Sequence, residues 1–128
     1  MSSEEKMGNT SYVLTIHTSD VRKAGTNATI KMQLVGENGQ TEIHEMDTVG
    51  YNDFEQNDTD DYKIRNNFSL GVLTELRVYN DGSGSAPDWH LGYVLVREDV
   101  PGGEENYAAT FNYNDWTGTE RWITIYPS

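Results

Sequence analysis

Residues 28–46 read ATIKMQLVGENGQTEIHEM, and this stretch decides the fold class. From Ala28 to Leu34, apolar and polar residues alternate, which is the two-residue period of a half-buried β-strand. Segment 37–40 then brings an Asn-Gly pair, whose residues tolerate the positive φ angles of a tight turn. With a second strand expected at 41–46, the stretch predicts a β-hairpin.

Outside this hairpin the chain continues as short alternating segments separated by Gly, Asn, Asp and Pro. A helical turn at 72–76 is an alternative, but 76–79 continues with the alternation of a strand. We therefore predict an all-β chain whose antiparallel strands form two packed sheets. The eight expected strands lie at 12–18, 28–34, 41–46, 61–66, 72–79, 91–98, 107–111 and 122–126.

Neither an internal repeat nor a low-complexity linker divides the chain. We expect residues 1–10 to be a flexible N-terminal segment and residues 11–128 to form a single domain. The start lacks the basic and apolar regions of a secretory signal, and no apolar run approaches the roughly 20 residues of a membrane span. If the chain is complete, these features predict a cytoplasmic protein.

The 128 residues include 9 Lys and Arg and 21 Asp and Glu, which gives a formal charge of −12. Such a charge repels phosphate backbones, so nucleic acid is not an expected partner. The chain has no cysteine, which excludes disulfides, thiolate nucleophiles and cysteine-ligated metals. A surplus of carboxylates suits a hard cation such as Ca²⁺, although the same residues also confer solubility.

Oxygen-bearing side chains gather in three predicted loops, at 23–27, 47–53 and 81–88. Calcium takes six to eight hard oxygen ligands, and Gly in such loops lets backbone carbonyls turn toward an ion. Asp and Asn are also ordinary turn residues, so the spacing alone leaves both interpretations open.

Short motifs follow one another along nearly the whole chain in the order and spacing of a known family. They are His17-Thr-Ser19, Ala24-Gly-Thr26, Glu45-Met-Asp47 with Gly50, Asn52-Asp-Phe54, Leu70-Gly71, Leu76-Arg-Val78, Pro87-Asp-Trp89, and Phe111-Asn112 with Trp116. The sequence resembles a PLAT domain, also called the lipoxygenase homology or LH2 domain. It is most similar to the C-terminal membrane-binding domain of alpha-toxin-type bacterial phospholipases C.

The resemblance implies a C2-like, eight-stranded sandwich of two four-stranded sheets. Its end loops bind Ca²⁺ in some members and engage membranes or protein partners. Carried over by position, the implied calcium-loop residues are Gly25, Thr26, Asn27, Asp47, Gly50, Asn52, Asp53 and Asp88. They fall in the three oxygen-rich loops.

Some positions depart from the family pattern. Lys23 stands where similar sequences place a ligating Asp, and an ammonium group has no lone pair to offer a metal. Asn27 replaces an Asp, Thr48 replaces an Asn, and Tyr51 resembles an insertion. We therefore expect one or two calcium ions rather than three. The strongest predicted site combines Asp47, Asp53, Asn52 and Asn27.

Two aromatic residues, Tyr51 and Trp89, lie inside the predicted calcium loops, where their rings could contact lipid or a partner. Trp89 could equally pack at an edge of the sandwich. The histidines show no metal-ligand spacing, and neither a nucleophile elbow nor a phosphate-binding loop is recognisable. We therefore do not expect an enzyme.

The sequence leaves two main functions open for a chain that we expect to be a monomer. The first is a Ca²⁺-binding module that associates with membrane lipids through its acidic end loops. The alternative is a protein-interaction module whose sheet face docks a partner, with calcium structural or absent. A calcium-containing glycan-binding sandwich is a third, less favoured interpretation.

Overall fold

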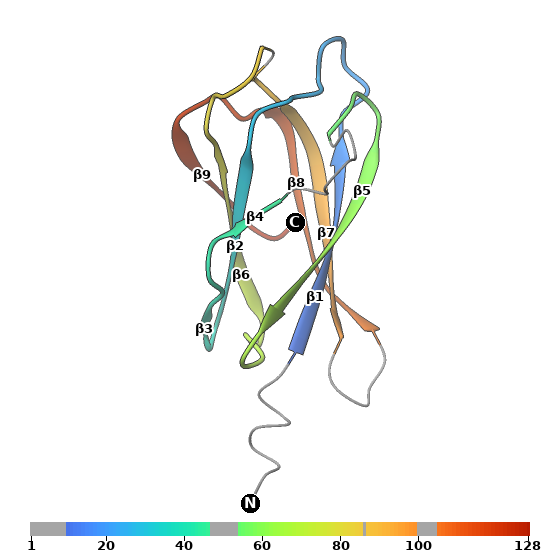
Figure 1. Cartoon of the computed structure of the whole chain (residues 1–128). Coiled ribbons are helices and arrows are strands. Elements are labelled where there is room, and N and C mark those ends of the chain that lie inside the picture. The colour runs from blue at the N-terminus through green and yellow to red at the C-terminus, as the bar shows by residue number, and fades with distance from the viewer. Residues whose placement is uncertain (1–9, 47–53, 86, 100–104) are drawn as a thin grey trace, which may run out of the picture.

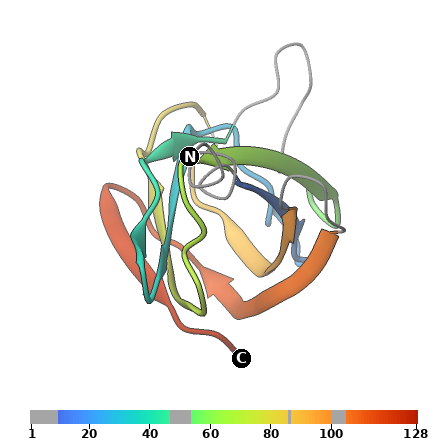
Figure 2. The same cartoon turned by 90° about the horizontal axis from the view of Figure 1, so that it is seen from below.

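The computed structural model describes residues 10–46, 54–85, 87–99 and 105–128, and all its regular elements are β-strands. Two antiparallel sheets pack face to face, as the two views in Figures 1 and 2 show. Within the described residues, no helix is long and apolar enough to cross a membrane. The strands are β1 (Thr10–Thr18), β2 (Ile30–Gly36), β3 (Gly39–Gln40), β4 (His44–Glu45), β5 (Thr59–Asn66), β6 (Leu73–Asn80), β7 (His90–Asp99), β8 (Glu105–Trp116) and β9 (Arg121–Ile125).

The first sheet has the strand order β5-β1-β7-β8, and the second has the order β3-β2-β6-β9 with β4 also paired to β2. This arrangement confirms the predicted all-β sandwich. The second sheet has five strands instead of four: β4 lies within the strand expected at 41–46, whereas β3 lies within the segment 37–40 that was expected to turn, and a break separates the two. At the break, the Thr41 carbonyl accepts the Gln33 side-chain amide at 2.8 Å, and the Thr41 hydroxyl accepts the Leu34 N–H at 3.2 Å. Side-chain bonds thus replace part of the backbone ladder.

Thr10, which the sequence placed in the N-terminal segment, begins β1 and is buried. The rest of that expected segment, residues 1–9, lies outside the described residues. β6 confirms the strand interpretation of the region that could have been a helical turn. β8 runs longer than the predicted 107–111 and contains a register shift opposite Val96 and Arg97.

The core fills the space between the sheets with the inward side chains of both layers. Strand alternation places one face of each strand inside, as the sequence pattern predicted. Full burial of a large apolar side chain stabilises the fold by roughly 1.5–3 kcal/mol. The largest fully buried side chains are Trp89, Tyr12, Phe111, Leu14, Ile16, Ile30, Met32, Leu34, Leu70, Leu76, Leu91 and Val78.

Tyr12 gives the fold a pH-sensitive contact at the end opposite the site described below. Its buried hydroxyl accepts the Leu70 N–H at 2.9 Å, and burial raises the pKa of Tyr12 above 10.0. The neutral phenol is therefore favoured in the fold, so its stabilising contribution is complete below pH ~10 and is lost as the pH rises through the raised pKa.

We expect Tyr12→Phe to lose less stability than the wild type when the pH is raised. At neutral pH the variant should be about 1 kcal/mol less stable than the wild type, because the Leu70 N–H loses its acceptor. Urea unfolding between neutral pH and about pH 11 measures both effects. The control is Tyr126→Phe, because Tyr126 is exposed. An alkaline profile of Tyr12→Phe that matches the wild type would contradict the assignment.

Candidate functional site

One end of the sandwich gathers four connecting segments, which we call the loop end. They are residues 19–29, 54–58, 81–89 apart from residue 86, and 117–120, and Figure 1 shows them together at the top of the molecule. Two of the three oxygen-rich loops predicted from the sequence therefore lie side by side. The third, 47–53, lies outside the described residues, and with it Asp47, Gly50, Tyr51, Asn52 and Asp53.

Gly25 allows the first loop to lie directly against the segment that begins at Phe54. A Cβ atom built on Gly25 would lie 2.9 Å from the Phe54 carbonyl oxygen and 3.1 Å from the Gln56 nitrogen. The neighbouring Thr26 N–H donates to the same Phe54 carbonyl at 3.1 Å. The structure thus gives Gly25 a steric role, and a larger residue would push the two segments apart.

Thr26 fixes the first loop to the third. Its side chain is buried, its hydroxyl donates to the Pro87 carbonyl at 2.6 Å, and the same oxygen accepts the Ala28 N–H at 3.0 Å. Because the hydroxyl already makes these two bonds, its contribution to the loop end is to position the backbone.

Asn80 is a site residue that sequence reasoning missed. Its buried side-chain amide donates to the Pro87 carbonyl at 2.6 Å, and its side-chain oxygen accepts the Gly82 N–H at 2.9 Å. A longer contact of 3.4 Å reaches the Thr117 hydroxyl. The sequence signal was an Asn-Asp-Gly turn, which predicted the chain reversal but not that Asn80 holds the third loop and the 117–120 turn together.

Asn27 and Asp88 lie exposed on the rim of the loop end. The Asn27 amide nitrogen donates to the Ser85 hydroxyl at 3.1 Å. One oxygen of Asp88, Oδ1, accepts the N–H groups of Trp89 at 2.9 Å and Gly118 at 3.1 Å. Asp88 therefore connects the third loop to the 117–120 turn while its carboxylate stays at the surface.

A second carboxylate on this end, Asp81, organises its own loop. Hydrogen bonds from the Ser83 hydroxyl and backbone N–H lower the pKa of Asp81 below 3.8. Its Oδ1 accepts the Ser83 N–H at 2.9 Å and the Thr29 N–H at 3.1 Å. Asp81 is thus ionised at neutral pH and ties the third loop to the start of β2.

Some of the side chains at the loop end are suitable ligands for a calcium ion. Asn27 and Asp88 supply an amide and a carboxylate oxygen at the rim, which are ligands that Ca²⁺ prefers. Among residues 10–46, 54–85, 87–99 and 105–128, however, no three Asp, Glu, His or Cys side chains come together as a metal site. Further carboxylates would have to come from Asp47 and Asp53.

Trp89 does not lie at the surface, which corrects the prediction that it contacts a membrane or partner. Its side chain is fully buried, its indole N–H donates to the Thr18 hydroxyl at 2.9 Å, and its ring lies 4.8 Å from that of Phe54. The alternative interpretation, packing at an edge of the sandwich, is the correct one. Among the described loop-end residues, the exposed large apolar side chain is Val21, at 39% exposure.

Asp60 is an acidic residue that the fold buries beside the loop end. Asp60 belongs to β5, is only 6% exposed, and accepts the Phe54 N–H at 3.2 Å. It therefore fixes the backbone at Phe54, where the described chain resumes.

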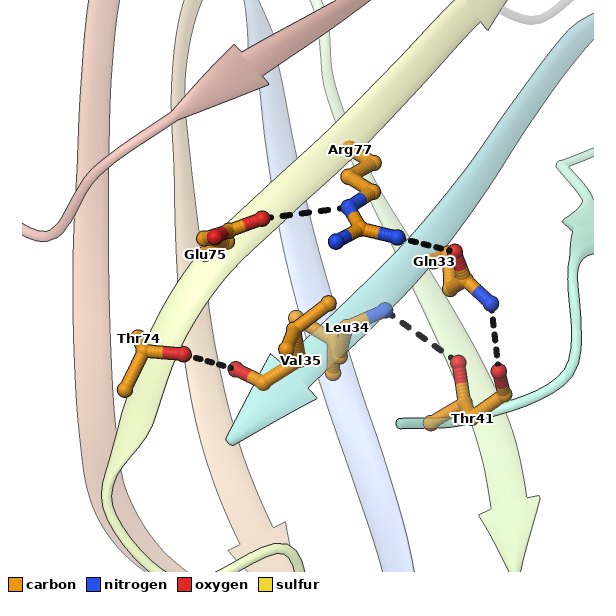
Figure 3. Close-up of polar contacts among 7 residues, drawn as sticks. All are labelled: Gln33, Leu34, Val35, Thr41, Thr74, Glu75 and Arg77. Atoms are coloured by element: carbon orange, nitrogen blue, oxygen red, sulfur yellow. Dashed lines mark hydrogen bonds and ion pairs between the residues drawn. The ribbon is translucent and has the colours of Figure 1, made fainter. Parts of the chain in front are cut away.

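The outer face of the second sheet carries a second group of polar and aromatic side chains. Arg77 lies between Glu75, at 3.1 Å, and the Gln33 side-chain oxygen, at 3.4 Å, as Figure 3 shows. Beside them the rings of Tyr79 and Trp122 lie 5.2 Å apart, and Trp122 is 44% exposed. We call these five residues the outer-face cluster.

The histidines near the loop end pair with hydroxyl groups. His17 Nδ1 lies 2.9 Å from the Thr59 hydroxyl, and His90 Nδ1 lies 2.7 Å from the Ser19 hydroxyl. In each pair the hydrogen bond fixes the orientation of the imidazole ring.

Comparison with known proteins agrees with this architecture. The family model for the PLAT/LH2 domain matches residues 12–124. The mouse lipoxygenase homology domain-containing protein 1 is 40% identical over 97 residues, which covers 75% of this chain and 5% of that protein. The chain thus spans a small part of this curated relative.

Two solved structures share the fold. A structure of a calcium-dependent 11R-lipoxygenase is 28% identical with a TM-score of 0.71, and the match covers 92% of this chain and 17% of that chain. The alpha toxin from Clostridium absonum is 21% identical with a TM-score of 0.73, covering 95% of this chain and 32% of the toxin chain.

Proposed function

Because this chain belongs to the PLAT/LH2 domain family, we propose that it is a calcium-binding module that associates with membrane lipids through its loop end. PLAT domains are non-catalytic modules, and the described part of this chain offers a binding surface built from loops. The observation that carries the proposal is that hydrogen bonds within the protein hold the rim of the loop end in place. Thr26 and Asn80 both donate to the Pro87 carbonyl, so the loops bearing Asn27 and Asp88 are held together by the protein's own bonds.

In this proposal one or two Ca²⁺ ions bind between the first loop and the segment 47–53. Asp47, Asp53, Asn52 and Asn27 are the strongest candidate ligands, with carbonyls of Gly25, Thr26 and Gly50 and the carboxylate of Asp88 as further donors. Bound calcium would offset the negative charge of the acidic loops, so that an anionic headgroup could approach a chain of charge −12.

The similar proteins support this proposal in part. The 11R-lipoxygenase is described as calcium-dependent, and its structure as suggesting a mechanism for calcium regulation. That description concerns the lipoxygenase, and it motivates the same test on this chain.

We expect millimolar Ca²⁺ to raise the melting temperature of chelator-treated protein by about 5–10 °C, because a ligand of the native state stabilises by mass action. Mg²⁺ serves as the ion control. Asp47→Asn with Asp53→Asn should abolish the calcium shift and leave the apo protein as stable or slightly more stable, since repulsion between the two carboxylates is relieved.

The matched variant is Asp61→Asn with Asp99→Asn, which removes the same charge from the outer face of the first sheet and should keep the calcium shift. The calcium proposal fails if Ca²⁺ and Mg²⁺ shift the wild type equally, or if the two double variants respond alike. Loss of apo folding in the Asp47/Asp53 variant would mean that these residues are structural.

The second candidate is a protein-interaction module, and the outer-face cluster favours it. Trp, Tyr and Arg are the residues that dominate binding energy in protein interfaces, and here they share one face of the second sheet. A melting temperature that does not respond to calcium, together with partner binding that Trp122→Ala abolishes, would favour this function over the first.

A further inference from the structure

The outermost part of the first loop is a tight turn of three exposed residues. The Ala24 N–H donates to the Val21 carbonyl at 2.9 Å, and Lys23 takes a positive φ of 63° at the third position of this turn. Val21, Arg22 and Lys23 are all exposed. We call these three residues the loop tip.

The base of the loop tip is fixed on both sides. Ser19 exchanges backbone and side-chain bonds with His90, and the buried Ala24 accepts the His90 N–H at 3.0 Å. Asp20, the nearest acid along the chain, accepts the Gln56 side-chain amide at 3.1 Å. The loop tip therefore projects from a base that the protein's own hydrogen bonds hold in place.

The charge of the loop tip differs from that of its surroundings. Arg22 and Lys23 form no ion pair with any residue that the structure describes. A further cation near this end, Arg121, donates its Nε–H to the Thr117 carbonyl at 3.1 Å. The exposed acids described at the loop end are Asp20, Glu55, Asp88 and Glu120, and Asp58 and Asp81 are partly exposed.

We propose that the loop tip is the element that contacts lipid and that Arg22 and Lys23 make this contact selective for anionic headgroups. The inference rests on the proposed function and names its lipid class. An apolar side chain beside two cations suits the membrane interface, where the apolar group enters the headgroup layer and the cations meet negative lipids. Calcium on the neighbouring acidic loops removes the repulsion that would otherwise oppose this contact.

The occupant is a lipid surface and not an acidic protein segment, because the loop tip is narrow and projects from the end of the sandwich (Figure 1). A protein interface needs a broad patch with a buried aromatic centre. The outer-face cluster is such a patch, and the loop tip has no aromatic residue.

The test is vesicle cosedimentation in millimolar Ca²⁺, with phosphatidylcholine vesicles and with vesicles in which about a third of the lipid is phosphatidylserine. Arg22→Gln with Lys23→Gln should weaken binding to the phosphatidylserine vesicles by about ten- to thirtyfold and leave the weaker phosphatidylcholine binding unchanged. Val21→Ala should weaken binding to both by about three- to tenfold.

Matched controls exist elsewhere on the chain. Lys63→Gln with Arg65→Gln makes the same charge change on β5, and Val72→Ala removes a side chain that is 64% exposed at the opposite end. Both controls should bind as the wild type does. Equal losses in the two charge variants would assign the effect to net charge and overturn the proposal.

Contact itself can be observed because the chain has no cysteine. A polarity-sensitive fluorophore attached to Val21→Cys should shift to the blue on phosphatidylserine vesicles, and the same label on Val72→Cys should not. A shift at Val72 alone would overturn the proposal.

The outcomes separate this inference from the proposed function. If the wild type binds vesicles with calcium and the Arg22/Lys23 variant binds equally well, the loop-tip proposal is wrong and membrane association stands. If calcium raises the melting temperature but no vesicle binds, calcium binding stands, and both membrane association and the loop-tip proposal are wrong.

Discussion

Trp89→Ala is expected to lower the free energy of unfolding by about 3–5 kcal/mol, the usual cost of removing a fully buried Trp side chain. The indole fills the space beside Phe54, and its N–H is bonded to the Thr18 hydroxyl at 2.9 Å. Truncation leaves a cavity and an unpaired buried hydroxyl, and both are destabilising. Urea unfolding followed by circular dichroism measures the loss.

Trp122→Ala is the matched control, because Trp122 is 44% exposed and contacts Tyr79 at the outer face of the second sheet. We expect a loss of about 1 kcal/mol or less for this variant. Equal losses in the two variants would contradict the burial of Trp89. Trp89→Phe should fall between them, because it keeps an aromatic ring and loses the bond to Thr18.

Asn80→Ala is the second large effect, with an expected loss of about 2–4 kcal/mol. The substitution removes one of two donors to the Pro87 carbonyl and the acceptor of the Gly82 N–H, in a position that water does not reach. The third loop should loosen as a result. Hydrogen exchange at residues 81–89 should therefore increase by more than the global loss of stability explains.

Asn66→Ala is the control for this prediction. Its side-chain amide also donates to a backbone carbonyl, that of Phe68 at 2.7 Å, but the contact is exposed and lies at the opposite end. We expect a loss below about 1 kcal/mol, because water can replace the bond. If Asn80→Ala costs no more than Asn66→Ala, Asn80 does not organise the loop end.

If calcium binds at the loop end, Asn80→Ala should also reduce the calcium-induced rise in melting temperature. The positions of the rim residues Asn27 and Asp88 depend on the hydrogen bonds to the Pro87 carbonyl. Asn27 follows Thr26, which donates to this carbonyl and fixes the first loop, and Asp88 follows Pro87 in the third loop. A variant that is less stable but keeps the full calcium shift would mean that the ion does not use this rim.

The sequence by itself determined the fold class and the family. The alternation of apolar and polar residues with a period of two indicates which side chains of a strand face the core, and it can be read from each strand alone. Gly and Asn at the turns and the ordered motifs needed no knowledge of contacts across the sandwich. The prediction was wrong at the hairpin, where β3 lies inside the expected turn and the bonds of Thr41 to Gln33 and Leu34 mark a break before β4.

Only the tertiary structure decided the roles of the loop residues. Trp89 is buried because Thr18, 71 positions away in the chain, meets its indole, and because Phe54 packs on its ring. Asn80 matters because the third loop and the 117–120 turn meet at its amide, and Val21 is prominent because the other large apolar side chains described at the loop end, Phe54 and Trp89, are buried. A loop has no regular alternation of apolar and polar residues from which burial could be predicted. The environment of its side chains is set by segments that are distant in the sequence, so only the folded structure shows it.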